Sequence, residues 1–299
     1  MNMKIDFNLH REGSGTHEWA EVNFNIGKGC ACDCRYCYAR WFAMHYKRIS
    51  DQVEWTCERF TDNAFKSDFK LLPGVIMFPS THNLSPFYLQ RALPILINML
   101  AAGNKVLIVT KPDIEVIKVL VGNLVKYRNQ ILFRFTIGSL DETLMRFWEP
   151  GAPSPEERLS ALDYAYAAGF STSISIEPML AGVDETLHVI SAVSRHVSET
   201  IWIGKMAHIK QRVDMTPDGV ADAVKLIESQ QSDSEIIRLY CALADNPKIR
   251  WKKSIAGVLK RHDTPQFRVK AENDKGFQLK RLIPAIPRKL IALMGNNNG

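Results

Sequence analysis

No stretch of this sequence is apolar over the roughly 20 residues that a membrane-spanning helix needs. Residues 1–6 are not followed by an apolar segment, so we expect no secretory signal peptide. Low-complexity tracts are absent as well, and the aromatic and charged fractions are those of an ordinary globular protein. These absences predict a cytoplasmic protein without a membrane partner, whose cysteines are reduced.

Cysteine is scarce, but its distribution is very uneven. Of six cysteines in 299 residues, four lie between positions 30 and 37: Cys30, Cys32, Cys34 and Cys37. Disulfides within so short a loop would be strained. Thiolates this close together are typical of a soft metal ion or of an iron–sulfur cluster.

The sequence also lacks a second cysteine pair, which makes a structural zinc site less suitable as an interpretation. A structural zinc site usually takes two cysteine pairs separated by a spacer. Cys34 and Cys37 form one such pair, whereas Cys57 and Cys241 are single and far apart. We expect these last two to be small buried side chains. A zinc ion bound by all four loop cysteines remains an alternative interpretation, although the backbone between these cysteines would be crowded.

Three cysteines follow the pattern Cys30-x3-Cys34-x2-Cys37, and we expect Cys32 to be a bystander. A ferredoxin supplies four thiolates to its four-iron cluster. Three thiolates would leave one iron without a protein ligand, and that iron could take a small molecule. The spacing therefore favours chemistry over electron storage.

Short apolar segments alternate with helical segments along most of the chain, which predicts parallel β/α units. The predicted strands are residues 21–26, 75–78, 105–110, 132–137, 172–177 and 201–205. The predicted helices are residues 38–44, 86–102, 112–127, 155–168, 184–196, 217–230 and 234–244. We expect Ser154 and Glu157 to form a capping box before the fourth of these helices. The strand at 172–177 has hydroxyls on one face, which favours a barrel with a polar interior over a doubly wound sheet.

Polar residues follow the predicted strands. They are the cysteine loop, residues 80–83, Lys111, Ser139, Glu177 and Lys205. In parallel β/α folds the carboxyl ends of the strands meet at one edge, where ligands bind. We expect one polar rim there, with His82 as a further candidate. Glu177 either contacts a ligand or pairs with Lys111 or Lys205.

The cysteine spacing, with Tyr36 before the last cysteine and the loop after the first strand, resembles the radical S-adenosylmethionine (SAM) superfamily. The resemblance implies a partial (β/α)6 TIM-like barrel. It also implies a [4Fe–4S] cluster on Cys30, Cys34 and Cys37, whose open iron binds SAM. The reduced cluster would cleave SAM to a 5′-deoxyadenosyl radical that abstracts hydrogen from substrate. An electron donor of the flavodoxin or ferredoxin type is the implied partner.

Within that superfamily the chain is most similar to the spore photoproduct lyase-like branch. The similarity lies in residues 29–40, 109–111, 137–141, 149–158 and 203–206, and spans roughly residues 20 to 210. It implies Lys111 and Ser139 as SAM contacts and Tyr36 and Tyr38 as catalytic residues near SAM. We add two rim residues to the cofactor-binding candidates, Ser80 and Glu177.

One departure leaves the substrate open. The lyase carries a hydrogen-donor cysteine after its second strand, and this chain has Pro79-Ser80-Thr81-His82 there. The sequence therefore predicts an enzyme without deciding between a lyase and a transferase.

The C-terminal part is strongly basic. From Lys248 onward there are thirteen Lys and Arg but only three acidic residues, which gives this part a net charge of about +10. Because the net charge of the whole chain is +6, the rest of the chain carries about −4. With Trp251 and Phe267 among the charges, it either binds nucleic acid or is a solvated face. We predict an N-terminal segment (1–19), a barrel (20–230) and a mainly helical basic extension (231–299). The alternative function is a nucleic-acid-binding protein with a structural metal at the cysteine loop.

Overall fold

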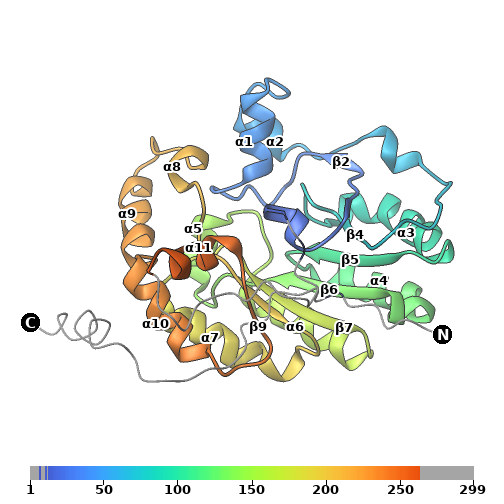
Figure 1. The fold of residues 1–299 in the computed structure, drawn as a ribbon. Helices are drawn as coiled ribbons and strands as arrows, with labels where there is room; N and C mark the ends of the chain where they lie inside the picture. Colours follow the sequence, from blue (N-terminus) through green and yellow to red (C-terminus); the bar gives the residue numbers. More distant parts are fainter. Residues whose placement is uncertain (1–6, 8–10, 12, 263–299) are drawn as a thin grey trace, which may run out of the picture.

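The computed structural model describes residues 7, 11 and 13–262, and its centre is a seven-stranded parallel sheet (Figure 1). The strands lie in the order β1 (Val22–Asn23), β4 (Val75–Phe78), β5 (Lys105–Thr110), β6 (Ile131–Thr136), β7 (Ser171–Ile176), β8 (Ile201–Ile203) and β9 (Ile249–Trp251). Each neighbouring pair is parallel, and the order follows the chain. Such a sheet curls into part of a barrel, which confirms the predicted α/β partial barrel. The seventh strand, β9, was not predicted.

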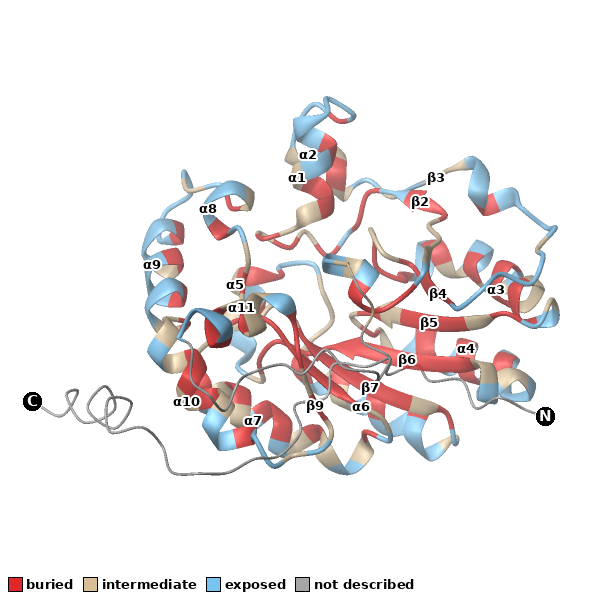
Figure 2. Ribbon diagram, in the orientation of Figure 1, coloured by how far each residue is buried: buried red, intermediate tan, exposed pale blue. Residues whose placement is uncertain are grey.

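Helices of the described chain cover the outer face of this sheet. They are α3 (Pro86–Ala101), α4 (Ile114–Leu124), α6 (Pro155–Ala167), α7 (Val183–Val193), α10 (Asp233–Leu243) and α11 (Lys253–Arg261). The outward side chains of the strands, such as Ile108, Phe133 and Ile174, are fully buried against them. Figure 2 shows the strands as the most buried part of the molecule. Burial on this face is the main contribution to stability.

The inner face of the sheet is also packed. Leu107, Leu132, Arg134 and Trp202 are buried there, and Trp19 from the N-terminal segment packs against them. Arg134 lies against both indole rings, 4.8 Å from Trp19 and 5.2 Å from Trp202, and burial lowers its pKa to about 9. Its Nε donates to the Ser173 hydroxyl at 3.1 Å. The serine face of β7 therefore meets a buried cation inside the barrel.

A second, two-stranded sheet carries the cysteine loop. In it β2 (Gly27–Lys28) pairs antiparallel with β3 (Arg59–Phe60), and α1 (Tyr38–His45) and α2 (Gln52–Thr56) lie between them in the chain. Of the predicted strand 21–26, only Val22–Asn23 is a strand, β1 of the main sheet, and the cysteine loop follows β2 instead. Figure 1 shows α1 and α2 above the edge of the main sheet.

Helix α6 begins at the predicted residue but with a different cap, and α4 begins later than predicted. Ser154 caps α6 by accepting from the Glu157 N–H at 3.2 Å, but the Glu157 carboxylate accepts from the Ile114 N–H, also at 3.2 Å. The capping box is thus only half formed, because Glu157 joins α6 to α4 instead. Asp113 accepts from Glu115 and Val116, so α4 begins at Ile114 rather than at residue 112.

Beyond β8 the chain forms α8 (Ile209–Arg212) and α9 (Val220–Gln230); α5 (Glu142–Trp148) precedes α6. The first part of the predicted extension packs on the sheet, because β9 pairs with β8 and Ile236, Leu239 and Trp251 are buried. The rest of the basic part, residues 263–299, lies outside the described residues. In the described chain no helix is long and apolar enough to cross a membrane.

Candidate functional site

The cysteine loop begins at a glycine that no other residue could replace without strain. Gly29 has a φ of +88°, and a Cβ there would lie 2.3 Å from the Cys57 carbonyl oxygen. The Cys30 N–H donates to the Trp55 carbonyl at 2.8 Å. The loop is therefore held against the end of α2 from its first residue.

Four thiols are gathered in this loop. Cys30, Cys32 and Cys34 are buried and Cys37 is half-buried. Two of the sulfurs accept backbone N–H groups at 3.4 Å, Cys30 from Asn83 and Cys37 from Arg40 in the first turn of α1. A hydrogen bond from Cys32 lowers the pKa of Cys30 to about 7, whereas burial raises the pKa of Cys34 to about 12.

Lys111, after β5, lies beside these thiols. Its Nζ is 3.8 Å from Glu149 Oε1 and 5.7 Å from the centre of the Tyr36 ring. Burial by itself would lower the pKa of Lys111, but the negative charges of Cys34 and Glu149 outweigh it and raise that pKa. The structure thus places a half-buried cation next to the cysteine loop. Its contact with SAM stays a prediction.

A buried ion pair supports this arrangement and was missed by the sequence reasoning. Glu149 accepts from the Tyr36 hydroxyl with one oxygen and from the Arg158 guanidinium with the other. Arg158 also donates to the carbonyls of Pro153 and Thr136 at 2.9 and 3.0 Å. Burial would raise the pKa of Glu149, but the charges of Arg158 and Lys111 lower it. The sequence did point to this region, because Glu149 and Arg158 are the first and last residues of segment 149–158, one of the segments that resemble the spore photoproduct lyase-like branch.

Tyr38 and Ser80 are joined on the other side of the loop. The Tyr38 hydroxyl donates to the Ser80 carbonyl, and Arg212 lies over the Tyr38 ring at 5.9 Å. Asn25 donates to the Ser80 hydroxyl at 2.9 Å and accepts from the Ser80 N–H at 2.7 Å. The segment after β4 is thereby fixed next to the first turn of α1.

Asn83 connects three parts of the predicted rim. Its amide group donates to the Lys111 carbonyl at 2.9 Å and accepts from the Lys111 N–H at 2.7 Å. Its backbone N–H reaches Cys30, as described above. The rim residues after β4 and β5 are therefore in direct contact with the cysteine loop, as expected.

His82 is buried and uses both ring nitrogens within the protein. Nδ1 lies 2.9 Å from the Asn83 carbonyl, and Nε2 accepts from the Ile26 N–H at 3.4 Å. The ring packs on Tyr88 with 4.1 Å between centroids. Burial lowers the pKa of His82 to about 4. His82 is therefore a neutral imidazole that holds Ile26, the residue before β2, in place.

Ser139 and Glu177 have partners of their own. The buried Ser139 hydroxyl donates to Glu185 at 2.6 Å. Glu177 lies 3.3 Å from the Lys252 ammonium, so neither pairing that we expected, with Lys111 or with Lys205, forms. Lys252 satisfies Glu177 because the unpredicted strand β9 brings it to the end of β7. Whether either residue contacts SAM is a prediction.

The two single cysteines correct an expectation. Cys57 and Cys241 are exposed, not buried. Cys57 ends α2 at the surface, and Cys241 is exposed on α10. Neither belongs to the site.

The residues of the loop fit an iron–sulfur cluster. Cys30, Cys34 and Cys37 supply thiols, N–H groups already point at two sulfurs, and Lys111 offsets thiolate charge; such hydrogen bonds and charges tune clusters in proteins. Among the described residues, no three His, Cys, Asp or Glu side chains are grouped so that they could hold one metal ion. A four-iron cluster makes a different demand, because each cysteine binds a different iron.

Comparison with known sequences finds one relative and no matching family model. The relative is the uncharacterized protein ORF301 of the Acidianus two-tailed virus. It is 28% identical over 259 residues, which are 78% of this chain and 81% of that protein.

Comparison with solved structures shows a shared fold. SuiB of Streptococcus suis matches with a TM-score of 0.50 at 12% identity, over 85% of this chain and 53% of SuiB. SuiB bound to its precursor peptide SuiA matches with a TM-score of 0.50 at 11% identity, over 85% of this chain and 54% of that one. A spore photoproduct lyase mutant with bound AdoMet has a TM-score of 0.46 at 15% identity, over 76% of this chain and 65% of the lyase. The chain thus spans between about half and two thirds of these proteins and shares the partial-barrel fold of SuiB.

Proposed function

We propose that this protein is a radical SAM enzyme. One observation carries the proposal: the C-x3-C-x2-C thiols, two buried and one half-buried, lie together at the carboxyl-end rim of a partial parallel barrel, beside the half-buried cation Lys111. The shared fold with SuiB supports it, because the resemblance inferred from the cysteines implies that fold.

Cys30, Cys34 and Cys37 would hold a [4Fe–4S] cluster. When bound, the cluster would supply the electron for reductive cleavage of SAM. Lys111 would balance the negative charge of the thiolates, and the backbone N–H groups of Asn83 and Arg40 would stabilise two of them. Cys32 would not bind the cluster.

The two tyrosines would be held in place for hydrogen transfer. Tyr36 is fixed by Glu149, and Tyr38 by the Ser80 carbonyl. Among the SAM-binding candidates, Lys111 is next to the cysteines, whereas Ser139 and Glu177 are already bonded to Glu185 and Lys252. We propose Lys111 and Ser80 as the first contacts and Ser139 and Glu177 as more distant ones.

We further propose that the enzyme acts in the cytoplasm with an electron donor of the flavodoxin or ferredoxin type. Nucleic acid is the preferred substrate class, because of the basic C-terminal part. A peptide is the second, since SuiB has been solved with a precursor peptide. Steeply salt-dependent binding of DNA or RNA supports the first, and its absence removes the reason for preferring it.

The test is anaerobic reconstitution followed by iron and sulfide analysis and EPR of the reduced protein. Because a [4Fe–4S] cluster contains four irons, we expect about four irons per chain. We also expect an EPR signal that changes when SAM is added. A signal indifferent to SAM would contradict binding at an open iron. One zinc without iron or sulfide would favour the structural-metal alternative.

Alanine variants of the cysteines sharpen this test. Cys34→Ala should lose the whole cluster, because the two remaining thiols would bind only two of its four irons. Cys32→Ala should keep the iron content of the wild type, and the exposed Cys57→Ala is the matched control. Equal iron loss in Cys32→Ala and Cys34→Ala would contradict the assignment of three ligands.

A further inference from the structure

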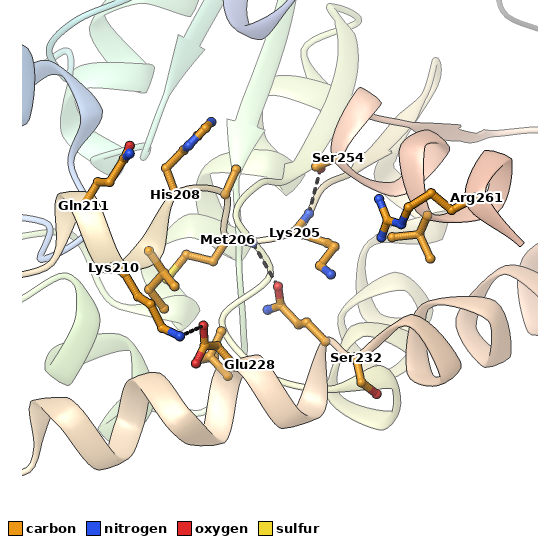
Figure 3. A pocket seen from close by; sticks show the side chains of 14 residues that line it. Lys205, Met206, His208, Lys210, Gln211, Glu228, Ser232, Ser254 and Arg261 are labelled. Carbon is orange, nitrogen blue, oxygen red and sulfur yellow. Dashed lines mark hydrogen bonds and ion pairs between the residues drawn. The ribbon is translucent and has the colours of Figure 1, made fainter. Parts of the chain in front are cut away.

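A hollow of about 580 Å³ opens at the carboxyl end of β8 (Figure 3). Its walls come from the segment after β8, from α8 and α9, from the N-cap of α10 and from one side of α11. The polar side chains that line it include Lys205, Lys210, Gln211, Glu228, Ser232, Ser254 and Arg261. The volume lies within the range of about 300–1,000 Å³ typical of ligand pockets.

Lys205 reaches into this hollow without a carboxylate partner. Its backbone N–H donates to the Ser254 hydroxyl at 3.1 Å, and Figure 3 shows its side chain extending between Ser232 and Arg261. No carboxylate of the described residues lies within ion-pair distance of its ammonium group. Burial lowers the pKa of Lys205; nearby Asp233 opposes this and Arg261 adds to it.

The other cations of the hollow are already paired. Lys210 lies 2.9 Å from Glu228, and one nitrogen of Arg261 donates to both oxygens of Asp233 at 2.9 and 3.0 Å. The charge that is left to attract a ligand is therefore that of Lys205.

Hydroxyl donors complete the surroundings of Lys205. Ser254 accepts from the Lys205 N–H, which leaves its own O–H free to donate to a ligand. Ser232 is the N-cap of α10, and Ser254 is in the first turn of α11, so two hydroxyl groups line the hollow near Lys205. An anion fits this combination.

The hollow adjoins the cysteine site. Met206, which follows Lys205, is buried in the same apolar cluster as Cys30, Cys34 and Trp148. Helix α8 forms part of the wall with Lys210 and ends at Arg212, whose guanidinium lies over Tyr38. A ligand held in the hollow would be one short helix away from the site.

We propose that this hollow binds a phosphate group of the substrate, with Lys205 as the charge that holds it. That the ligand is the substrate rests on the proposed function; the binding itself does not. Phosphate is favoured over carboxylate because a lysine point charge with hydroxyl donors suits phosphate. Carboxylates are typically held by an arginine fork, and the guanidinium of Arg261 already donates through one nitrogen to Asp233.

The test is calorimetric titration of the reconstituted full chain with inorganic phosphate, uridine 5′-monophosphate, glucose 6-phosphate and a single-stranded oligonucleotide. Uridine and succinate are the controls without phosphate. We expect saturable binding of at least one phosphate probe. Lys205→Gln should weaken it about tenfold or more, and Lys205→Arg should largely keep it, since the charged hydrogen bond is lost only in the first variant. Lys225→Gln, which removes a paired lysine from α9 outside the hollow, should bind like the wild type.

A second variant keeps the test decisive if Lys205→Gln folds poorly. Ser232→Asp preserves a favourable N-cap for α10 and places a negative charge in the hollow, so it should abolish phosphate binding while the chain stays folded. Lys205-dependent binding of the oligonucleotide alone identifies a nucleic-acid phosphate, and binding of the small probes a phosphorylated metabolite; both support the proposal. Equal binding by Lys205→Gln and wild type, equal affinity for succinate, or no binding of any phosphate probe would overturn it. Failure of SAM cleavage would overturn the proposed function and leave this result unaffected.

Discussion

At the scale of single residues, the site is held by polar groups that come from distant parts of the chain. Asn83 bonds both backbone groups of Lys111 and also reaches Cys30, and Glu149 bonds both Tyr36 and Arg158. Each of these groups is buried, so a lost partner would leave an unsatisfied polar atom at a cost of about 1–3 kcal/mol. The side chains of the site are therefore oriented before any ligand arrives.

His82 should make stability depend on pH. Its pKa is lowered from 6.5 to about 4 in the folded state, so the unfolded chain binds the proton more readily. The stabilisation is complete above pH 6.5 and is lost as the pH falls toward 4, by roughly 3 kcal/mol in total. Protonation would also place an N–H of the ring against the Ile26 N–H. Denaturant unfolding of the full chain between pH 7.5 and 4.5 measures this loss.

The matched variant is His82→Phe, which retains a ring against Tyr88 but cannot titrate. It should be less stable than the wild type at pH 7.5, because Ile26 loses its acceptor, yet its stability should change less between pH 6.5 and 4.5. Identical pH slopes in the two proteins would show that another group is responsible.

At the scale of elements, the cysteine loop is clamped between α2 and the segment that joins α5 to α6. The Arg35 N–H donates to the Trp148 carbonyl at 2.9 Å, and the Gly151 N–H donates to the Cys32 carbonyl at 3.2 Å. These are backbone contacts, so they position the loop whatever its side chains bind. The spacing of cysteines is thereby converted into a fixed geometry.

Gly151→Ala should push the segment between α5 and α6 away from the cysteine loop. A Cβ at position 151 would lie 2.0 Å from the Ala31 carbonyl oxygen, which is backbone and cannot swing aside. We expect a loss of about 1–3 kcal/mol in the free energy of unfolding, as for other overpacked sites, and a lower iron content after reconstitution. Gly122→Ala is the control: it lies in α4 with open space around it and should stabilise by about 0.5–1 kcal/mol. Similar effects of both variants would refute the clamp.

Glu149 ties the end of α5 to α6 through Arg158. Glu149→Gln would leave the buried Arg158 and the half-buried Lys111 without their carboxylate, so we expect about 3–5 kcal/mol of destabilisation. Glu142→Gln, which breaks an exposed pair with Arg146 on α5, should change stability little. Chemical denaturation compares the two. A small effect of Glu149→Gln would mean that water or a neighbour compensates the buried charges.

At the scale of the whole molecule, Lys252 joins three distant segments. Its ammonium lies 3.2 Å from Glu18 and 3.3 Å from Glu177, donates to the Gly15 carbonyl at 2.8 Å and lies over the Trp19 ring at 4.1 Å. The N-terminal segment, the end of β7 and the start of α11 therefore meet at one buried charge.

Lys252→Met should weaken this junction. The carboxylates of Glu18 and Glu177 would lose the ammonium that neutralises them, with an expected cost of about 3–5 kcal/mol. Lys253→Met, the neighbouring substitution at an exposed side chain, should change stability little. Thermal unfolding of both variants measures the difference, and comparable melting temperatures would show that the junction does not contribute to the stability of the whole.

The fold could be predicted to different degrees in different parts. The strands at 75–78 and 105–110 were predicted to the residue, because each is an apolar run between turn signals. Strand β9 was missed because Ile249-Arg250-Trp251 is short and lies within a basic stretch. Its assignment depends on pairing with β8, which no local pattern shows.

What the sequence by itself determined is the set of thiols, their spacing and the β/α order that places them at the rim, because these are properties of chain position and local periodicity. What only the tertiary structure decided is which polar groups meet: Glu149 with Arg158, Glu177 with Lys252, Asn83 with Lys111, and Lys205 with an open hollow. The physical reason is that burial and pairing of charge depend on contacts between residues far apart in the chain.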